Sequence, residues 1–232
     1  MKNLYTLLAL IAFTNFSFAG EVEDDLDDFT TVVANGNYKL FLKKGDQPHI
    51  KVVNNEPELE DDQIAWEVKG GELKVDIKKS IFKKLELEIY VTYNEISTIE
   101  AKGGAWINVE DVLTGNEVEL KCASNGIISI ELDCKTVKAS VAPGSNGEIK
   151  LKGKAENADL KVMTGGFISA IHLEAKEVVA KVSTGGDISC WATEKMDLKV
   201  SISGTIKYTF DGDKSNFNEK TTGGEIKKYK SE

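Results

Sequence analysis

Three features of the sequence predict an all-β fold, a right-handed parallel β-helix (β-solenoid) with coils of about 20 residues. A short glycine-led motif returns six times at intervals close to 20 residues. Apolar residues alternate with period two on both sides of each glycine, which is strand geometry, and no segment shows sustained helical periodicity. So short a unit cannot bury an apolar face alone and must stack on copies of itself. The motifs occupy 126–130, 147–151, 166–170, 186–190, 204–208 and 224–228.

Each glycine is predicted to supply the positive φ that a corner of the coil requires. The doubled glycines at 103–104, 165–166, 185–186 and 223–224 could instead suggest phosphate cradles. A phosphate-binding loop needs a following Lys-Ser/Thr and a helix, and neither follows here. A leucine-rich repeat would need fixed Leu and Asn positions and a helical segment, which are also absent.

The N-terminus reads as a secretory signal peptide over residues 1–19. Lys2 precedes an apolar run over 4–13, and the small residue Ala19 marks the expected cleavage point. The run is shorter than the roughly 20 apolar residues that span a bilayer, so no transmembrane anchor is predicted. The rest, 20–232, is predicted to be a single β-helix domain, with two packed halves, 20–100 and 101–232, as the alternative. Wound uniformly, the 232 − 19 = 213 mature residues would make about 10 or 11 coils.

The segments between residues 20 and 109 are predicted to be less regular than the later coils. An acidic run at 21–28 is interpreted as a solvated leader that blunts one end of the stack. Asn35-Gly36-Asn37 predicts a tight turn, and Lys69-Gly70-Gly71 predicts another. Spacing between the strands is looser here, so the coils are expected to be irregular or mixed with hairpins. The expected strands are 29–33, 38–42, 50–53, 65–68, 73–77, 85–91 and 96–101, followed by an imperfect motif at 102–109.

The charge of the chain excludes some partners. Its 29 basic residues are all lysine, against 38 acidic residues and a net charge of −9. An acidic chain without arginine is poorly suited to bind nucleic acid, because contact with phosphates would meet net repulsion. The missing guanidinium fork also argues against tight recognition of carboxylate or phosphate.

The three cysteines, Cys122, Cys134 and Cys190, all fall on the inward parity of their strands. They are therefore interpreted as small buried apolar residues, with a Cys122–Cys134 disulfide left open as an alternative. Neither histidine is spaced with these thiols as a metal site requires. No catalytic constellation and no cofactor site is found, so no enzyme activity is predicted.

Four residues beside the glycine motifs are the predicted surface contacts. Thr164 and Thr184 precede double glycines and are expected to align along one edge of the stack, where a hydroxyl ladder stabilises the coils or, alternatively, lines a glycan-binding surface. Phe167 is expected to point outward and Asp187 occupies the matching position of the next coil. An outward aromatic ring can stack on a sugar or a partner. Other outward-parity candidates are Trp66, Trp106, Trp191 and Tyr208.

Asp211 and Asp213 lie in a loop that partly matches a calcium-binding pattern. The glycine and the terminal Glu219 are out of register with an EF-hand. A surface loop is the favoured interpretation, and calcium at Asp211 and Asp213 is the alternative.

The order of these motifs resembles a known family. The pattern [Val/Leu]-Lys-Val-x-[Ser/Thr]-Gly-Gly-x-Ile-x at 160–170, 179–190 and 198–208, with an opening at 29–77, is similar to the head GIN domain of auto-transporter adhesins. These are exported proteins common in Bacteroidetes, and the similarity covers nearly all of the mature chain. The resemblance implies a right-handed β-helix and a surface or periplasmic role in adhesion, and it carries over no catalytic residues. Pro143-Gly144-Ser145 and the single glycine of Ser203-Gly204 depart from the pattern.

The main hypothesis from the sequence is an exported, non-enzymatic binding or adhesion module that contacts a glycan or an envelope or matrix protein. One alternative is a carbohydrate-active enzyme on the same scaffold, which requires a cleft with clustered carboxylates and a metal. Another is an envelope sensor whose partner is a second exported protein.

Overall fold

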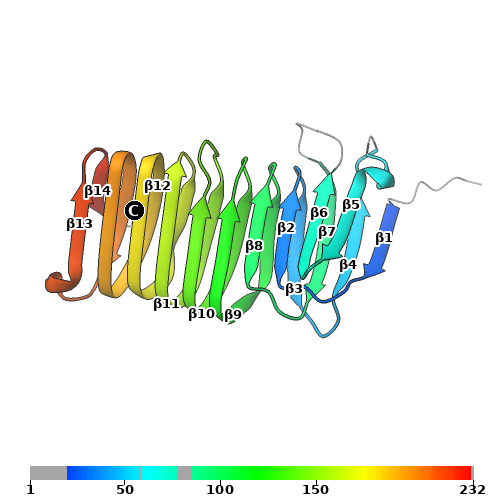
Figure 1. The fold of residues 1–232 in the computed structure, drawn as a ribbon, viewed down its shortest axis with the longest axis horizontal. Helices are drawn as coiled ribbons and strands as arrows, with labels where there is room; N and C mark the ends of the chain where they lie inside the picture. The colour runs from blue at the N-terminus through cyan, green and yellow to red at the C-terminus, as the bar shows by residue number, and fades with distance from the viewer. Residues whose placement is uncertain (1–19, 58, 78–84, 231–232) are drawn as a thin grey trace, which may run out of the picture.

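The protein is an elongated β-solenoid, here in a computed structural model that describes residues 20–57, 59–77 and 85–230 (Figure 1). Coils of about 21 residues stack into about six turns, which confirms the predicted fold class. This is fewer than the roughly 10 or 11 coils that the whole mature chain would make if it were wound uniformly. The early strands include antiparallel pairs and do not all wind as coils. The predicted signal peptide, residues 1–19, lies outside the described residues.

The strands form two hydrogen-bonded ladders that share the same long strands. Ladder A begins with β5 (Ile64–Lys69), β6 (Glu72–Ile77), β2 (Thr31–Asn35) and β8 (Thr98–Lys102). Ladder B begins with β1 (Gly20–Asp25), β4 (His49–Asn54), β7 (Leu87–Tyr93) and β3 (Lys39–Lys44). Both continue through β9 (Trp106–Cys122), β10 (Ile127–Val141), β11 (Glu148–Thr164) and β12 (Phe167–Phe210), and end at β13 (Phe217–Thr221) in ladder A and β14 (Glu225–Lys228) in ladder B.

The interior is built from columns of residues in register. Ile107, Ile128, Ile149 and Ile168 are neighbours in successive coils, and none of the four is more than 1% exposed. In another column large and small side chains alternate, as close packing of layers favours. That column is Leu120, Ala139, Leu160 and Ala180.

The glycines of the regular coils are needed for two physical reasons. Gly186 has φ +86°, and a Cβ there would lie 2.6 Å from Val162 Cγ1 and 2.7 Å from the carbonyl oxygen of Gly166. The prediction that every glycine supplies positive φ is wrong at Gly126, Gly147 and Gly223; before Gly126, Ser124 and Asn125 take the left-handed conformation instead. Gly126 is required there because a Cβ would collide with the carbonyl oxygen of Ala101.

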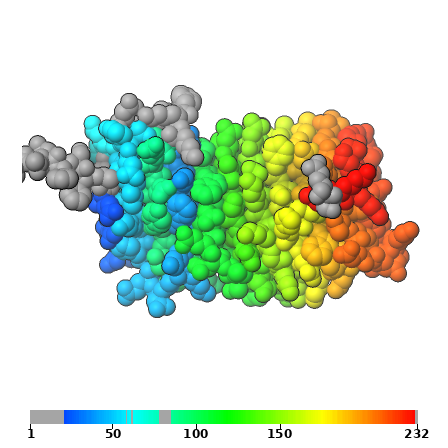
Figure 2. All heavy atoms as spheres, turned by 180° about the vertical axis from the view of Figure 1, so that it is seen from behind, coloured from blue at the N-terminus to red at the C-terminus, as the bar shows by residue number. Residues whose placement is uncertain are grey.

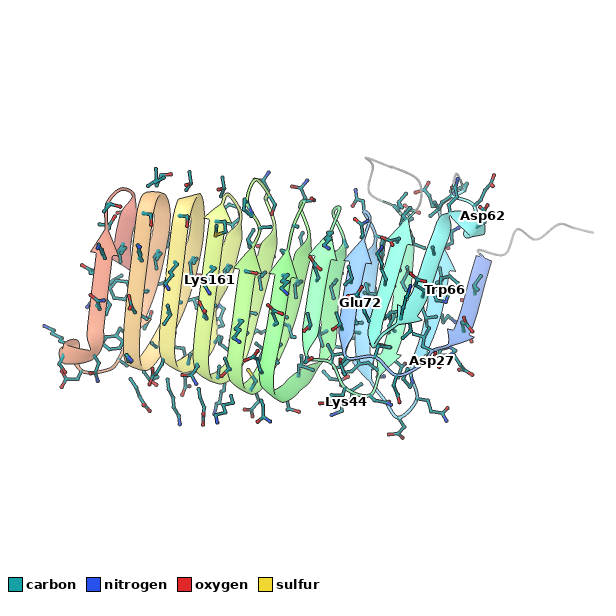
Figure 3. All side chains as sticks on the ribbon, viewed as in Figure 1. Asp27, Lys44, Asp62, Trp66, Glu72 and Lys161 are labelled. Atoms are coloured by element: carbon teal, nitrogen blue, oxygen red, sulfur yellow. The ribbon has the colours of Figure 1, made fainter. Side chains whose placement is uncertain are left out.

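The outer surface of the regular coils carries short-range ion pairs within single strands. Lys161 (Figure 3) has its Nζ 2.7 Å from Asp159 Oδ2. Lys121 Nζ lies 2.8 Å from Glu119 Oε2. Each such exposed pair is worth only about 0–1 kcal/mol. The stability of this region therefore comes from the interior columns and the backbone ladders.

The acidic run is not merely the solvated leader that the sequence suggested. Residues 20–25 form strand β1, which pairs antiparallel with β4 along its whole length. Lys51 lies 2.9 Å from Glu21 and 3.2 Å from Glu23, and His49 lies 3.0 Å from Asp25. Pairing with β4 gives the backbone groups of β1 protein partners in place of the water that would solvate a free leader.

Turns and hairpins of the N-terminal region are largely as predicted. β5 and β6 form an antiparallel hairpin through the predicted turn at Lys69-Gly70-Gly71. Asn35-Gly36-Asn37 is a turn, but β2 and β3 on its two sides belong to different ladders. Figure 2 shows the contrast between regions: colours succeed one another along the regular coils, while early and later segments intermix at the N-terminal end.

All three cysteines are free and buried, as the interpretation as small apolar residues predicted. Cys122 aligns with Val141 and Cys134 with Ala155, so the two occupy different columns and no disulfide joins them. Burial raises the pKa of Cys122 to about 12, of Cys134 to about 11 and of Cys190 to about 12. Such thiols are chemically inert at neutral pH. Among the described residues, no helix has the length and apolar character needed to cross a bilayer.

Candidate functional site

Three aromatic rings gather on the outer side of ladder B, and we call them the aromatic platform: Phe41, Tyr90 and Trp106. Phe41 on β3 lies between buried Leu40 and Leu42, and strand alternation therefore turns it outward. Tyr90 on β7 is flanked in the same way by Ile89 and Val91, and Trp106 on β9 precedes buried Ile107.

The register of the parallel strands brings the rings of the aromatic platform into contact. Tyr90 and Phe41 are direct neighbours, and their rings stack with centroids 5.0 Å apart and planes 14° from parallel. Trp106 is the neighbour of Lys39, diagonal to Phe41, and meets Phe41 in a T-shaped arrangement at 5.8 Å. Tyr90 is 38% exposed, and Phe41 and Trp106 are half-buried. Contact with one another holds the rings in place while part of their surface stays open to solvent.

A polar rim lies beside the aromatic platform. Lys39 Nζ is 2.7 Å from Glu88 Oε1, and the Tyr90 hydroxyl donates to Glu88 Oε2 at 2.8 Å. These two donors lower the pKa of the Glu88 carboxyl below its ordinary value. Glu88 therefore stays ionised at neutral pH and is poorly suited to act as a proton donor in catalysis.

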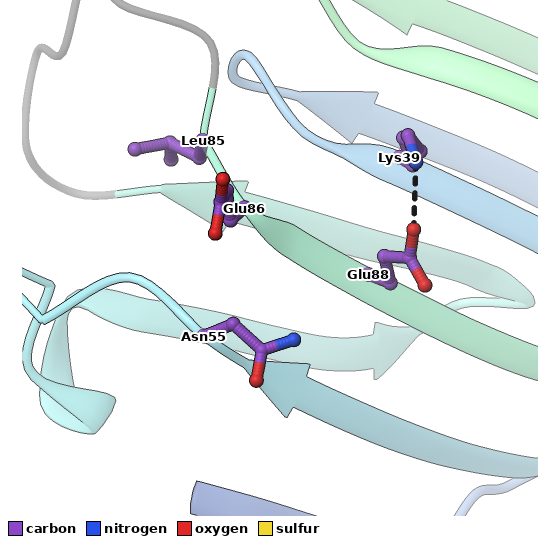
Figure 4. A pocket seen from close by; sticks show the side chains of 5 residues that line it. All are labelled: Lys39, Asn55, Leu85, Glu86 and Glu88. Atoms are coloured by element: carbon purple, nitrogen blue, oxygen red, sulfur yellow. Dashed lines mark hydrogen bonds and ion pairs between the residues drawn. The ribbon is translucent and has the colours of Figure 1, made fainter. Parts of the chain in front are cut away.

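Two shallow hollows flank Lys39. One, of about 440 Å³, is lined by Lys39, Asn55, Leu85, Glu86 and Glu88, and Figure 4 shows the ion pair at one side of it. The other, of about 380 Å³, is more apolar and is lined by Asn37, Tyr38, Lys39, Gly104, Trp106 and Ile127. Hollows of this size accommodate small ligands or short segments of larger ones. Rings, amides and charged groups thus converge on one stretch of the surface.

The four residues that the sequence singled out lie around two consecutive glycine turns of β11 and β12. Thr164 and Thr184 are neighbours in register, as expected of a hydroxyl ladder. Phe167 is 49% exposed, and the backbone N–H of Asp187 donates to the carbonyl of Gly166 at 3.0 Å. Their role as ligand contacts stays a prediction.

Phe167 belongs to the same outer column as the aromatic platform. The register runs from Trp106 through Ile127 and Glu148 to Phe167. Three strand spacings of about 4.8 Å separate Phe167 from Trp106, or about 14 Å. Phe167 is therefore a neighbour of the aromatic platform, but too distant to touch its rings.

The other aromatic candidates have structural partners. Trp66, on β5 near the N-terminal end (Figure 3), donates from Nε1 to Asp24 at 3.3 Å. Trp191 donates to Asp211 at 2.7 Å. Tyr208 packs against Phe217 with ring centroids 4.9 Å apart at the C-terminal end of the stack.

At the loop considered for calcium, both carboxylates accept internal hydrogen bonds. Asp211 accepts from Trp191, and Asp213 accepts from the backbone N–H and the hydroxyl of Ser215, each at 2.9 Å. The bond from the Ser215 backbone lowers the pKa of Asp213, which caps the short helix η2 (Lys214–Asn216). Within the described ranges, no three His, Cys, Asp or Glu side chains come together as a metal site would need. Calcium uptake by Asp211 and Asp213 stays a prediction.

Two members of the aromatic platform, Phe41 and Tyr90, were missed in the sequence, which pointed only to Trp106. Each lies between two apolar residues of its strand, and this alternation in the sequence already predicts that its ring points outward. The two rings are 49 residues apart in the chain, however, and the register of β3 on β7 decides that they touch.

Comparison with known proteins gives a consistent picture. A family described as "putative auto-transporter adhesin, head GIN domain" matches residues 28–211. A "putative adhesin" from Bacteroides fragilis has a similar solved structure, with 25% identity, a TM-score of 0.79, and coverage of 90% of this chain and 96% of that one.

Two further solved structures share the fold at lower identity. A "putative lipid binding protein" from Parabacteroides distasonis has 22% identity, a TM-score of 0.70, and coverage of 91% of this chain and 96% of that one. A "putative adhesin" from Parabacteroides merdae has 19% identity, a TM-score of 0.67 and the same coverage. No curated protein matches the chain.

Proposed function

Because the chain belongs to the family of auto-transporter adhesins with a head GIN domain, we propose that it is an exported, non-enzymatic, adhesin-like binding module whose ligand surface is the aromatic platform. The supporting observation is the contact of Phe41, Tyr90 and Trp106 on the outer face of a stiff sheet. Sites on rigid strands hold their geometry better than sites on loops. The signal-like residues 1–19 support export to the periplasm or the cell surface.

The ligand proposed for the aromatic platform is a glycan. Sugar rings present C–H faces that pack on aromatic side chains and hydroxyls that bond to polar neighbours. Here Lys39, Glu88 and Asn37 supply polar groups beside the rings. The ion-paired, hydrogen-bonded state of Glu88 favours binding over catalysis, because both carboxylate oxygens already have partners.

A glycan array followed by calorimetry on the best saccharide tests this proposal. Trp106→Ala should weaken binding at least about fivefold, since loss of one stacked ring costs about 1–3 kcal/mol. Phe167→Ala separates the aromatic platform from the contacts predicted at the glycine turns: Phe167 points outward in the same column about 14 Å from Trp106, and its loss should change affinity less than threefold if the aromatic platform holds the saccharide. Thermal melts should show both variants folded.

Three outcomes would overturn the proposal: no saccharide bound, equal affinity for the native and Trp106→Ala proteins, or binding only to lipid vesicles or a purified matrix protein. Turnover of any bound saccharide would replace the binding role with an enzymatic one.

A further inference from the structure

Ladder B begins and ends in strands of opposite charge. β1, at one end, carries Glu21, Glu23, Asp24 and Asp25. β14, at the other end, carries Lys227 and Lys228, and Lys230 follows it. Glu225 is the one acidic residue in the segment 225–230, so this end is positively charged. Within the described residues, β1 pairs only with β4 and β14 only with β12, so each leaves one backbone edge open.

The two end strands run in the same direction. β1 is antiparallel to β4, and β4 is antiparallel to β7, so β1 is parallel to β7. From β7 onward every pairing in ladder B is parallel, through to β12 and β14. A second copy shifted along the stack axis therefore brings its β1 beside β14 in the parallel sense that the ladder already uses.

The register that would result is chemically matched at its inner positions. The interior isoleucine column ends at Ile226 on β14, and the corresponding inward residue of β1 is Val22. Both are only partly buried although they pack against the core. With Val22 beside Ile226, the next two pairs are Glu23 with Lys227 and Asp24 with Lys228. Glu21 with Glu225 is the one like-charged pair.

We propose that this protein self-associates head to tail, with β14 of one copy adding in parallel to β1 of the next. Backbone hydrogen bonds and the continued interior column supply the contact, as in other cases of strand addition. The charges select the orientation, because two acidic β1 edges or two lysine-rich β14 edges would repel. Such a contact does not close on itself and produces open chains. The inference is independent of the glycan ligand.

Sedimentation velocity of the protein purified after export, with its N-terminus defined by mass spectrometry, tests the proposal. The native protein should form concentration-dependent oligomers at low salt, and high salt should weaken them, because the charge pairs at the contact are screened. Lys227→Glu with Lys228→Glu should be monomeric, and so should Glu23→Lys with Asp24→Lys. An equimolar mixture of these two variants should regain oligomers, since each acidic edge then finds a basic one. Lys150→Glu, a charge reversal in the middle of the stack, should associate as the native protein does.

A disulfide trap provides a readout that does not depend on charge. Glu23→Cys and Lys227→Cys in one chain should give a ladder of covalent oligomers under mild oxidation. Lys150→Cys in place of Lys227→Cys should give none. A native protein that stays monomeric at every concentration, charge reversals at β14 that leave association unchanged, or equal cross-linking in trap and control would each overturn the proposal.

Discussion

The region from residue 20 to 102 and the region from 106 to 230 solve the same packing problem in different ways. The later region repeats one coil, with parallel strands, interior columns of like residues and glycine corners in close contact. The earlier region mixes parallel and antiparallel strands and includes a hairpin whose Gly70 and Gly71 face open space. A crowded corner such as Gly186 thus tolerates little change, whereas the hairpin at Gly70 and Gly71 is less constrained.

The outer surfaces differ as well. Ion pairs such as Lys161 with Asp159 lie on the outer face of the regular coils, while the aromatic platform stands where the irregular strands join the first coil. The recognition chemistry that we propose therefore lies at the junction, built from β3, β7 and β9. The repeated coils provide a rigid support, and the irregular strands beside them bring different kinds of side chain into contact.

The largest effect is expected from a glycine substitution in a regular coil. Gly186→Ala should destabilise the protein by about 4 kcal/mol, because strained backbone costs about 1–3 kcal/mol and an overpacked methyl adds a similar amount. The matched change Gly70→Ala, at φ +61° with no atom within 4 Å, should cost about 1 kcal/mol. Equilibrium unfolding in urea measures both. Equal losses would show that the two kinds of corner do not differ as described.

An intermediate effect is expected from the outward aromatics of the two regions. Phe41→Ala removes a ring that contacts both Tyr90 and Trp106 and should cost about 1.5 kcal/mol. Phe167→Ala, on the regular coils and 49% exposed, should cost less than about 0.5 kcal/mol. Thermal unfolding of the two variants makes the comparison. A larger loss of stability for Phe167→Ala than for Phe41→Ala would contradict the prediction, because it would show that outward rings pack more tightly on the regular coils.

The smallest effect is expected in the pH dependence of stability. Because the folded-state pKa of Glu88 is depressed, its contribution is present above the ordinary glutamate value of 4.5 and is lost as the pH falls through the lower folded value. Glu88→Gln should remove that part of the acid sensitivity, worth less than about 1 kcal/mol at this part-exposed pair. Glu148→Gln, whose carboxylate pairs with Lys150 alone at 3.1 Å, is the control. Unfolding curves between pH 3 and 7 that are identical for native and Glu88→Gln protein would contradict the prediction.

Local sequence patterns predicted much of this structure, but they failed where a residue's role depends on another strand. The hairpin at Gly70-Gly71 and the three buried cysteines were readable from turn residues and parity. The pairing of β1 was missed, because an acidic run resembles a solvated leader until Lys51 and His49 of another strand are placed beside it. Gly126 was expected to adopt positive φ, but its role depends on the carbonyl of Ala101 in the previous coil.

By itself the sequence determined the repeat, the parity of each strand and therefore which side chains face inward, since these depend on neighbours within one coil. Only the tertiary structure decided which coil lies beside which, and with that the contact of Phe41, Tyr90 and Trp106 and the opposite charges of the two end strands. The physical reason is that alternation along a strand fixes which of its side chains face inward, but not which other strand, tens of positions away in the chain, it pairs with.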